Sequence, residues 1–185
     1  MKIIVAVTGA SGAIYAHILL KKLVKLADQY ERVDLVFSET ALPVWKYELP
    51  GVSIDDIPFK KYKPDNFFAP MASGSAGYDR MIVIPCTMGT LARIASGEAS
   101  DLLTRAADVI LKERGKLILV TRESPLNLIH LKNMQRVTEA GGIICPANPS
   151  FYSNPGSIEE LVETVVNRAL RLAGLDTNIK GFMEE

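Results

Sequence analysis

The stretch VAVTGASGAIYA, residues 5–16, decides the fold class of this chain. An apolar run breaks at a turn of glycine and other small residues, and a small-residue run suited to a helix follows. This order is typical of phosphate-binding α/β proteins, because backbone N–H groups and the amino end of a helix attract an anion. Ser11 could cap the helix or donate to a phosphate. The same turn is also compatible with a tight strand–helix connection that binds no ligand.

Four further apolar runs follow, and each is continuous rather than alternating, which indicates strands buried on both faces of a parallel sheet. The five predicted strands are 2–7, 33–37, 80–85, 116–121 and 142–146. The six predicted helices are 13–28, 40–48, 88–96, 100–114, 126–140 and 157–173. This alternation predicts one α/β domain over residues 1–185, a Rossmann-like (flavodoxin-like) doubly wound parallel sheet with three α/β/α layers.

Residues 49–72 interrupt the alternation with four prolines and several aromatic residues. We expect an irregular segment with a short strand near residues 59–62. It is too long for a passive connection in a compact domain, and we therefore expect it to cover a site or an interface.

Charge and hydropathy argue against two classes of partner. Lys plus Arg and Asp plus Glu both total 21, so no basic field exists to collect nucleic-acid phosphates. No apolar run approaches the roughly 18 residues that a membrane span requires, and the first run is too short for a secretory signal. We expect a cytoplasmic protein with neither nucleic acid nor a membrane as partner.

The cysteines and histidines do not indicate a metal site, a redox dithiol or a hydrolase triad. Cys86 and Cys145 lack C-x-x-C spacing, and each follows an apolar run, so we expect both to pack at strand ends. His17 and His130 fall inside predicted helices, where we expect their ring nitrogens to be satisfied rather than to bind a metal.

A second turn, in residues 85–97, repeats the order of strand, small polar turn and helix. Thr87 and Thr90 could donate hydrogen bonds there. Two such turns at neighbouring strand ends would form a cradle for one mononucleotide. Glu39, after the second predicted strand, could bind the ribose of NAD, but the glycine spacing argues against a dinucleotide.

Charged residues fall at two informative positions. Arg122 and Glu123 directly follow the buried strand 116–121, so they should enter the ligand crevice and provide one phosphate clamp and one proton-transfer group. Arg105 and Lys112 lie seven residues apart, hence on one helix face, where they could equally be solvated surface cations.

The loop 145–157 follows the last predicted strand, and three prolines stiffen it. It presents Tyr152, and the next predicted helix carries Arg168. A phenol and a guanidinium suit a phosphate, but loop packing and a surface cation explain the two residues equally well.

Several motifs together resemble the UbiX-type flavin prenyltransferases, and the resemblance spans about residues 2–172. These motifs are GASGAIYA, SGSAGYD, IPCTMGTLARIASG, the long block from Arg105 to Tyr152, and VNRAL. The resemblance implies a homododecamer that binds FMN between subunits. It also implies metal-free transfer of a dimethylallyl group from dimethylallyl phosphate to N5 and C6 of reduced FMN, and delivery of the prenylated FMN to a UbiD-type decarboxylase.

The resemblance also assigns site residues. It implies FMN contacts at Gly9, Ala10, Ser11, Ser38, Thr87, Met88, Gly89, Thr90 and Arg122. It implies prenyl-phosphate contacts at Lys112, Arg122, Tyr152 and Arg168, with Ser11 nearby. Glu123 matches a glutamate that transfers protons during ring closure and phosphate departure, and Glu48 matches a second glutamate near the flavin ring.

The chain departs from the family pattern at three positions. Glu39 and Gly89 stand where the family usually has lysine. The family often has a tryptophan near the C-terminus, whereas the single tryptophan here is Trp45 and Phe182 is the candidate to replace it.

Two alternative functions have the same fold. The first is an FMN-dependent decarboxylase of the phosphopantothenoylcysteine or lantibiotic cysteine type, which uses a histidine after the first helix region and an Asn-containing substrate loop. The second is a non-catalytic flavin carrier, which would not need Lys112, Arg122 and Glu123 for a second phosphate.

Overall fold

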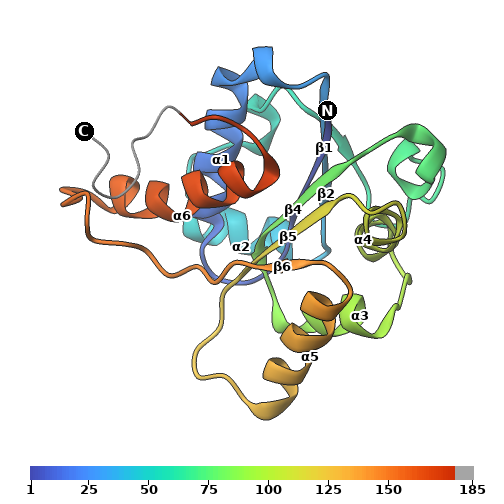
Figure 1. Cartoon of the computed structure of the whole chain (residues 1–185). Coiled ribbons are helices and arrows are strands. Elements are labelled where there is room, and N and C mark those ends of the chain that lie inside the picture. Colours follow the sequence, from blue (N-terminus) through green and yellow to red (C-terminus); the bar gives the residue numbers. More distant parts are fainter. Residues whose placement is uncertain (178–185) are drawn as a thin grey trace.

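The computed structural model describes residues 1–177, in which one six-stranded parallel sheet lies between two layers of helices (Figure 1). The strands are β1 (Lys2–Val7), β2 (Arg32–Phe37), β3 (Lys60–Tyr62), β4 (Arg80–Cys86), β5 (Lys116–Thr121) and β6 (Ile143–Ile144). The helices are α1 (Ala13–Lys25), α2 (Ala41–Glu48), α3 (Met88–Ser96), α4 (Leu102–Lys112), α5 (Leu128–Glu139) and α6 (Ile158–Ala173). Four single 3-10 turns are η1 (Ala27–Gln29), η2 (Ile54–Asp56), η3 (Pro70–Ala72) and η4 (Gly74–Ala76).

The two faces of the sheet are buried by different helices. Ile3, Val5 and Val7 of β1 pack in a cluster with residues of α1, α2 and α6. Ile4 and Ala6 of the same strand pack in a second cluster with residues of α3, α4 and α5. Both faces are therefore apolar, which explains why the strands read as continuous apolar runs. The predicted doubly wound three-layer α/β/α fold is confirmed.

The predicted elements differ from the observed ones mainly at their ends. The predicted strand 142–146 is observed only as the two-residue strand β6. Hydrogen bonding to β5 nevertheless continues beyond β6, because the N–H groups of Cys145 and Ala147 donate to β5 carbonyls at 2.9 and 2.8 Å. Pro146 between them has no N–H to donate. At α4, the Asp101 side chain caps the helix, so the helix begins at Leu102 rather than at residue 100.

The irregular segment contributes one strand to the sheet. β3 pairs in parallel with β2 at residues 60–62, which confirms the short strand expected there. The rest of the segment, through η3 and η4, lies beside α4 and returns the chain to β4.

The strand order β3-β2-β1-β4-β5-β6 reverses direction between β1 and β4. In an open α/β sheet, a ligand binds outside the carboxyl ends of the strands at such a switch point. The turns after β1 and β4 are the two turns that the sequence singles out, and they are neighbours at this edge.

A buried carboxylate ties the irregular segment to the sheet. Asp34 of β2 is buried, and it accepts hydrogen bonds from Arg32 at 2.6 Å and from the hydroxyl of Tyr78. Burial and the bond to Asp34 raise the pKa of Tyr78 far above its ordinary value, so its hydroxyl remains a donor. This interaction fixes the chain just after η4 against β2.

Replacing Tyr78 with Phe should remove one donor from a buried carboxylate and lower the free energy of unfolding by about 1–3 kcal/mol. Urea denaturation of both proteins measures the difference. Tyr30→Phe is a matched control, because the Tyr30 hydroxyl donates to a neutral carbonyl, that of Leu23, at 2.6 Å. A Tyr78→Phe loss no larger than the control loss would contradict this account.

Candidate active site

One buried hydroxyl joins the two turns of the site. Thr8, which directly follows β1, donates to the carbonyl of Pro85 at 2.6 Å and accepts from the N–H of Thr87 at 3.0 Å. Its side chain therefore holds the turn after β1 against the turn after β4. The sequence interpretation missed Thr8. Its only signal was a hydroxyl residue between a buried strand and the first glycine.

Gly9 is required by the close approach of the first turn to α2. A Cβ atom on Gly9 would lie 2.6 Å from the Cβ of Thr40, which is closer than side chains tolerate. Absence of a side chain at Gly9 thus lets the amino ends of α1 and α2 converge. Ala10 beside it is buried, and Ser11 is exposed.

The amino end of α1 holds a carboxylate from the chain itself. Glu48, the last residue of α2, accepts hydrogen bonds from the N–H groups of Gly12 and Ala13 at 2.8 and 2.7 Å. Gly12 is the N-cap residue, with a left-handed φ of 108°. The expectation that Ser11 caps this helix is therefore wrong, and these two N–H groups serve Glu48 rather than a phosphate.

Glu48 also orients its neighbours. Burial would raise the pKa of Glu48, but hydrogen bonds from the Ser11 hydroxyl, Ala13 and Gly12, together with the charge of Arg122, outweigh burial and lower it. The carboxylate is therefore a permanent anion at neutral pH. It directs the Ser11 hydroxyl and attracts the Arg122 guanidinium, so the predicted residues Ser11, Glu48 and Arg122 do come together.

The turn after β4 provides a second helix amino end. The Thr87 hydroxyl caps α3 by accepting from the N–H of Thr90 at 3.1 Å, and it lies 3.0 Å from the Thr90 hydroxyl. Met88 and Thr90 are buried and Gly89 is exposed. Because the helix dipole adds positive potential to the N–H groups here, this end of α3 suits an anion.

Arg122 links the end of β5 to this turn. Its N–H donates to the carbonyl of Cys86 at 3.2 Å. Its Nε is buried and has no hydrogen-bond partner among residues 1–177. A buried guanidinium donor of this kind suits a phosphate or another anionic ligand. Glu123 follows directly and is exposed, and its carboxylate accepts from the N–H of Ser124 at 3.0 Å.

Ser38 lies beside a cavity at the same edge. The cavity has a volume of about 480 Å³ and opens between the loops after β2 and β3, the second half of α3 at Arg93, and the start of α4. Its lining includes Ser38, Glu39, Lys63 and the ion pair between Arg93 and Asp101, in which the charged atoms lie 2.5 Å apart. Glu39, one of the departures from the family pattern, thus adds negative charge next to a predicted FMN contact.

Tyr152 and Arg168 lie beyond the end of β6. Arg168 is exposed on α6, and its charge partly offsets the rise that burial produces in the pKa of Cys145. Arg168 is therefore near the carboxyl end of the sheet. Tyr152 is exposed in the loop that connects this end to α6.

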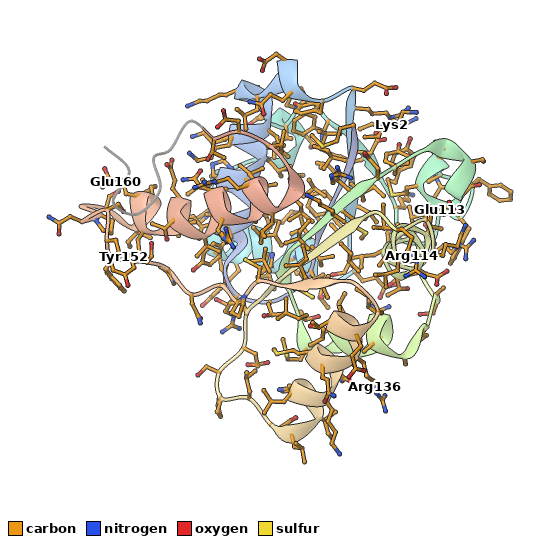
Figure 2. All side chains as sticks on the ribbon, in the orientation of Figure 1. Lys2, Glu113, Arg114, Arg136, Tyr152 and Glu160 are labelled. Atoms are coloured by element: carbon orange, nitrogen blue, oxygen red, sulfur yellow. The ribbon has the colours of Figure 1, made fainter. Side chains whose placement is uncertain are left out.

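Lys112 does not join the other predicted residues within one chain. It ends α4, whereas β5 begins only four residues later, so Lys112 lies at the amino edge of the sheet and Arg122 at the carboxyl edge. The strand alone separates the two edges by roughly 15–20 Å. Figure 2 shows Glu113, the neighbour of Lys112, on the opposite side of the molecule from Tyr152. The Lys112 ammonium instead contacts the Glu113 carboxylate.

The histidines and cysteines behave mainly as expected. Both cysteines are buried, and burial raises the pKa of both thiols, that of Cys86 to about 12. His130 is satisfied in the capping box of α5. His17 packs edge-on against Trp45, but its Nδ1 has no hydrogen-bond partner among residues 1–177, so the expectation of a satisfied ring was wrong there.

The described part of the chain lacks two features, a metal cluster and a membrane-spanning helix. Residues 1–177 contain no group of three or more His, Cys, Asp or Glu side chains arranged to hold a metal ion. None of the helices in that range is both long and apolar enough to cross a membrane. Phe182, the candidate replacement for a C-terminal tryptophan, lies outside the described residues.

Glu48→Gln should destabilise the protein by about 1–2 kcal/mol at neutral pH, because an amide replaces a carboxylate that caps α1. Folding lowers the pKa of Glu48, so its carboxylate adds to the free energy of unfolding at pH values above its ordinary pKa of 4.5. This contribution is lost as the pH falls through the pKa of Glu48 in the folded protein. Denaturation between pH 7 and pH 3.5 measures it (roughly the titration range of a carboxylate). The difference in the free energy of unfolding between the wild type and Glu48→Gln should become smaller as the pH is lowered. The control Glu123→Gln, at an exposed site, should differ little from the wild type across the same range. A gap that is independent of pH would contradict this assignment.

The chain matches known proteins over nearly its whole length. The Flavoprotein family model matches residues 1–170. The flavin prenyltransferase UbiX of Methanocaldococcus jannaschii is 42% identical over 184 residues, which cover 97% of this chain and 96% of that protein. The structure of AnUbiX (PadA1) in complex with FMN and dimethylallyl pyrophosphate has a TM-score of 0.88 at 43% identity and covers 97% of both chains.

A second solved structure covers the entire chain. It is the dodecameric FMN-dependent Ubix-like decarboxylase from Escherichia coli O157:H7, with a TM-score of 0.92, 40% identity and 100% coverage of both chains. The chain therefore belongs to the flavoprotein family and, within it, to the UbiX-type flavin prenyltransferases.

Proposed function

We propose that this protein is a metal-independent flavin prenyltransferase, which joins a dimethylallyl group to N5 and C6 of reduced FMN for use by a UbiD-type decarboxylase. The observation that carries the proposal is the Arg122 guanidinium, whose buried Nε has no hydrogen-bond partner among residues 1–177. Arg122 lies between the FMN cradle and the exposed carboxylate of Glu123. A site for FMN alone would not need that combination.

The donor set fits FMN. Gly9, Ala10 and Ser11 form a turn without bulky side chains, and the amino end of α3 with Thr87 and Thr90 offers N–H and hydroxyl groups to a single phosphate. The first turn is partly occupied by Glu48, which supports the second turn as the main phosphate site. We propose that Ser38, Met88, Gly89 and Arg122 complete the contacts. Reduced FMN supplies the nucleophilic nitrogen and carbon atoms.

The prenyl donor needs positive charge where its phosphate leaves. In the first transfer, the bond between the allylic carbon and the ester oxygen breaks, its electron pair leaves with the phosphate, the carbon bonds to N5, and N5 releases its proton to a base. Without a metal, cations and hydroxyl donors must stabilise that phosphate. We propose that Arg122, Arg168 and Tyr152 do so, with Ser11 nearby. The positive charge that develops on the allylic carbon as the ester bond breaks can be stabilised by the faces of neighbouring aromatic rings.

We propose separate roles for the two glutamates. Glu123 is exposed at the end of β5 and can accept and return protons during ring closure and phosphate departure. Glu48 is held as an anion by its hydrogen bonds, so it is suited to orient Ser11 and Arg122 rather than to donate a proton.

Lys112 can serve the phosphate only from another copy of the chain, because it lies at the opposite edge of its own sheet. We propose a homo-oligomer in which Lys112 of one copy completes the site of the next, with a dodecamer as the expected assembly. The dodecameric relative of 40% identity supports this proposal.

Among the alternatives, the cysteine-decarboxylase type gains nothing from His17. The ring of His17 packs against Trp45, and burial together with the charge of Lys21 lowers its pKa. A non-catalytic carrier would need no second phosphate site and would leave Glu123 without a role.

Prenyl transfer is tested by incubating the protein anaerobically with reduced FMN and either dimethylallyl phosphate or dimethylallyl pyrophosphate, then measuring the mass of the extracted flavin. We expect a flavin heavier by one isoprene unit with at least one donor. Glu123→Gln should retain FMN but form product about 10²–10⁴ times more slowly. Unchanged flavin mass with both donors refutes the transferase, and release of carbon dioxide from a cysteine-terminal peptide would favour the decarboxylase.

A further inference from the structure

The backbone ladder between β1 and β4 ends before it reaches the two turns of the site. Its last pair is Ala6 with Val83, two residues before Thr8 and Pro85 respectively. β4 also shifts register against β5 between Val83 and Cys86. Pro85 has no N–H, so it cannot donate the next ladder bond. Main-chain pairing therefore does not fix how far apart the turn after β1 and the turn after β4 lie.

The side chain of Thr8 bridges the two chains at this point. Thr8 is 2% exposed, and its hydroxyl donates to the Pro85 carbonyl and accepts from the Thr87 N–H. A residue within a ladder makes the same two kinds of bond, one to a carbonyl and one from an N–H. The hydroxyl thus replaces a backbone partner, and it binds the residue that caps α3.

The amino end of α3 depends on this bond for its position relative to the first turn. The helix packs mainly against α5, and the ion pair between Arg93 and Asp101 ties its second half to α4. These contacts place the body of the helix, whereas the bond from Thr87 to Thr8 places its first N–H groups.

The same bond determines which N–H groups of α3 are left for a ligand. The first four N–H groups of a helix have no partner within it. At α3, that of Thr87 donates to Thr8 and that of Thr90 donates to the Thr87 hydroxyl. Within residues 1–177 this leaves the N–H groups of Met88 and Gly89. A Cβ on Gly89 would lie 4.0 Å from the nearest side chain described other than those of its two sequence neighbours, so the space beside these groups is open.

We infer that Thr8 is a positioning residue for the phosphate of the flavin. Its hydroxyl holds the N–H groups of Met88 and Gly89 at the distance from the first turn that one bound phosphate requires. The inference rests on the proposed function, which supplies FMN as the ligand. Because Thr8 is buried, it acts through α3 rather than by touching FMN. A small displacement of this helix end weakens phosphate binding, since the helix dipole acts on an anion only near the first turn.

Titration of the flavin-free protein with FMN, followed by flavin fluorescence, tests the inference. Thr8→Val nearly keeps the shape of the side chain but leaves the Thr87 N–H without its acceptor. We expect the FMN dissociation constant to rise at least about tenfold, the effect of losing a well-placed hydrogen bond. Thr8→Ser retains the hydroxyl and should bind FMN within about threefold of the wild type. Circular dichroism checks folding, and Thr8→Ala, which removes the same hydroxyl, replaces Thr8→Val should that variant not fold.

Thr104→Val is the matched control. Thr104 is 1% exposed, and its hydroxyl also donates to a carbonyl and accepts from an N–H, but both groups belong to Asp101 at the start of α4. This variant should lose stability and keep the FMN affinity of the wild type. Riboflavin is the matched ligand, because it has the ring and ribityl chain of FMN without the phosphate. Its dissociation constant should change less than about threefold in Thr8→Val.

A loss confined to FMN and to variants without the Thr8 hydroxyl supports the inference. Unchanged FMN binding in Thr8→Val, the same loss in Thr104→Val, or an equal loss of riboflavin binding would overturn it. The titration does not involve prenyl transfer. Thr8-dependent FMN binding in a wild type that forms no prenylated flavin would therefore retain the inference and reject the proposed function.

Discussion

Parallel pairing gives the sheet a direction, and the rest of the molecule depends on it. All six strands end at one edge, so the turns after β1, β4 and β5 meet there. The Thr8 hydroxyl then fixes two of these turns to each other by bonding to Pro85 and Thr87. Because these groups lie on the ends of buried strands, the packing of both helical layers holds them in position. For the same reason, residues that come directly before a strand lie at the opposite, amino edge of the sheet.

That constraint explains why the predicted phosphate ligands do not all meet within one chain. Arg122 follows β5 and joins the cradle, whereas Lys112 precedes β5 and lies at the far edge. No rotamer change spans the length of a strand. If both cations neutralise one leaving phosphate, two copies must meet at each site. Oligomerisation is then part of the chemistry.

Most of the fold could be predicted from the sequence, because strands buried on both faces leave continuous apolar runs that glycine-rich turns and helical patterns separate. The position of Lys112 could also have been predicted, since it precedes the strand that Arg122 follows. Glu48 was harder. Its carboxylate caps α1 from 36 residues away along the chain, and no local pattern reports such a contact. Nor does the sequence reveal that Thr8 bridges two turns, because that bond depends on how β1 and β4 pair.

The central claim is that Lys112 and Arg122 act on one phosphate from different copies, and mixed oligomers test it most directly. Lys112→Ala and Arg122→Ala chains, each inactive alone, are co-expressed with different tags and purified as heteromers. Random pairing makes about a quarter of the sites whole if the two residues come from different copies. Flavin prenylation should then recover to about that fraction of the wild-type rate. If both residues act within one chain, no site is whole, and the heteromers would remain as inactive as the single variants.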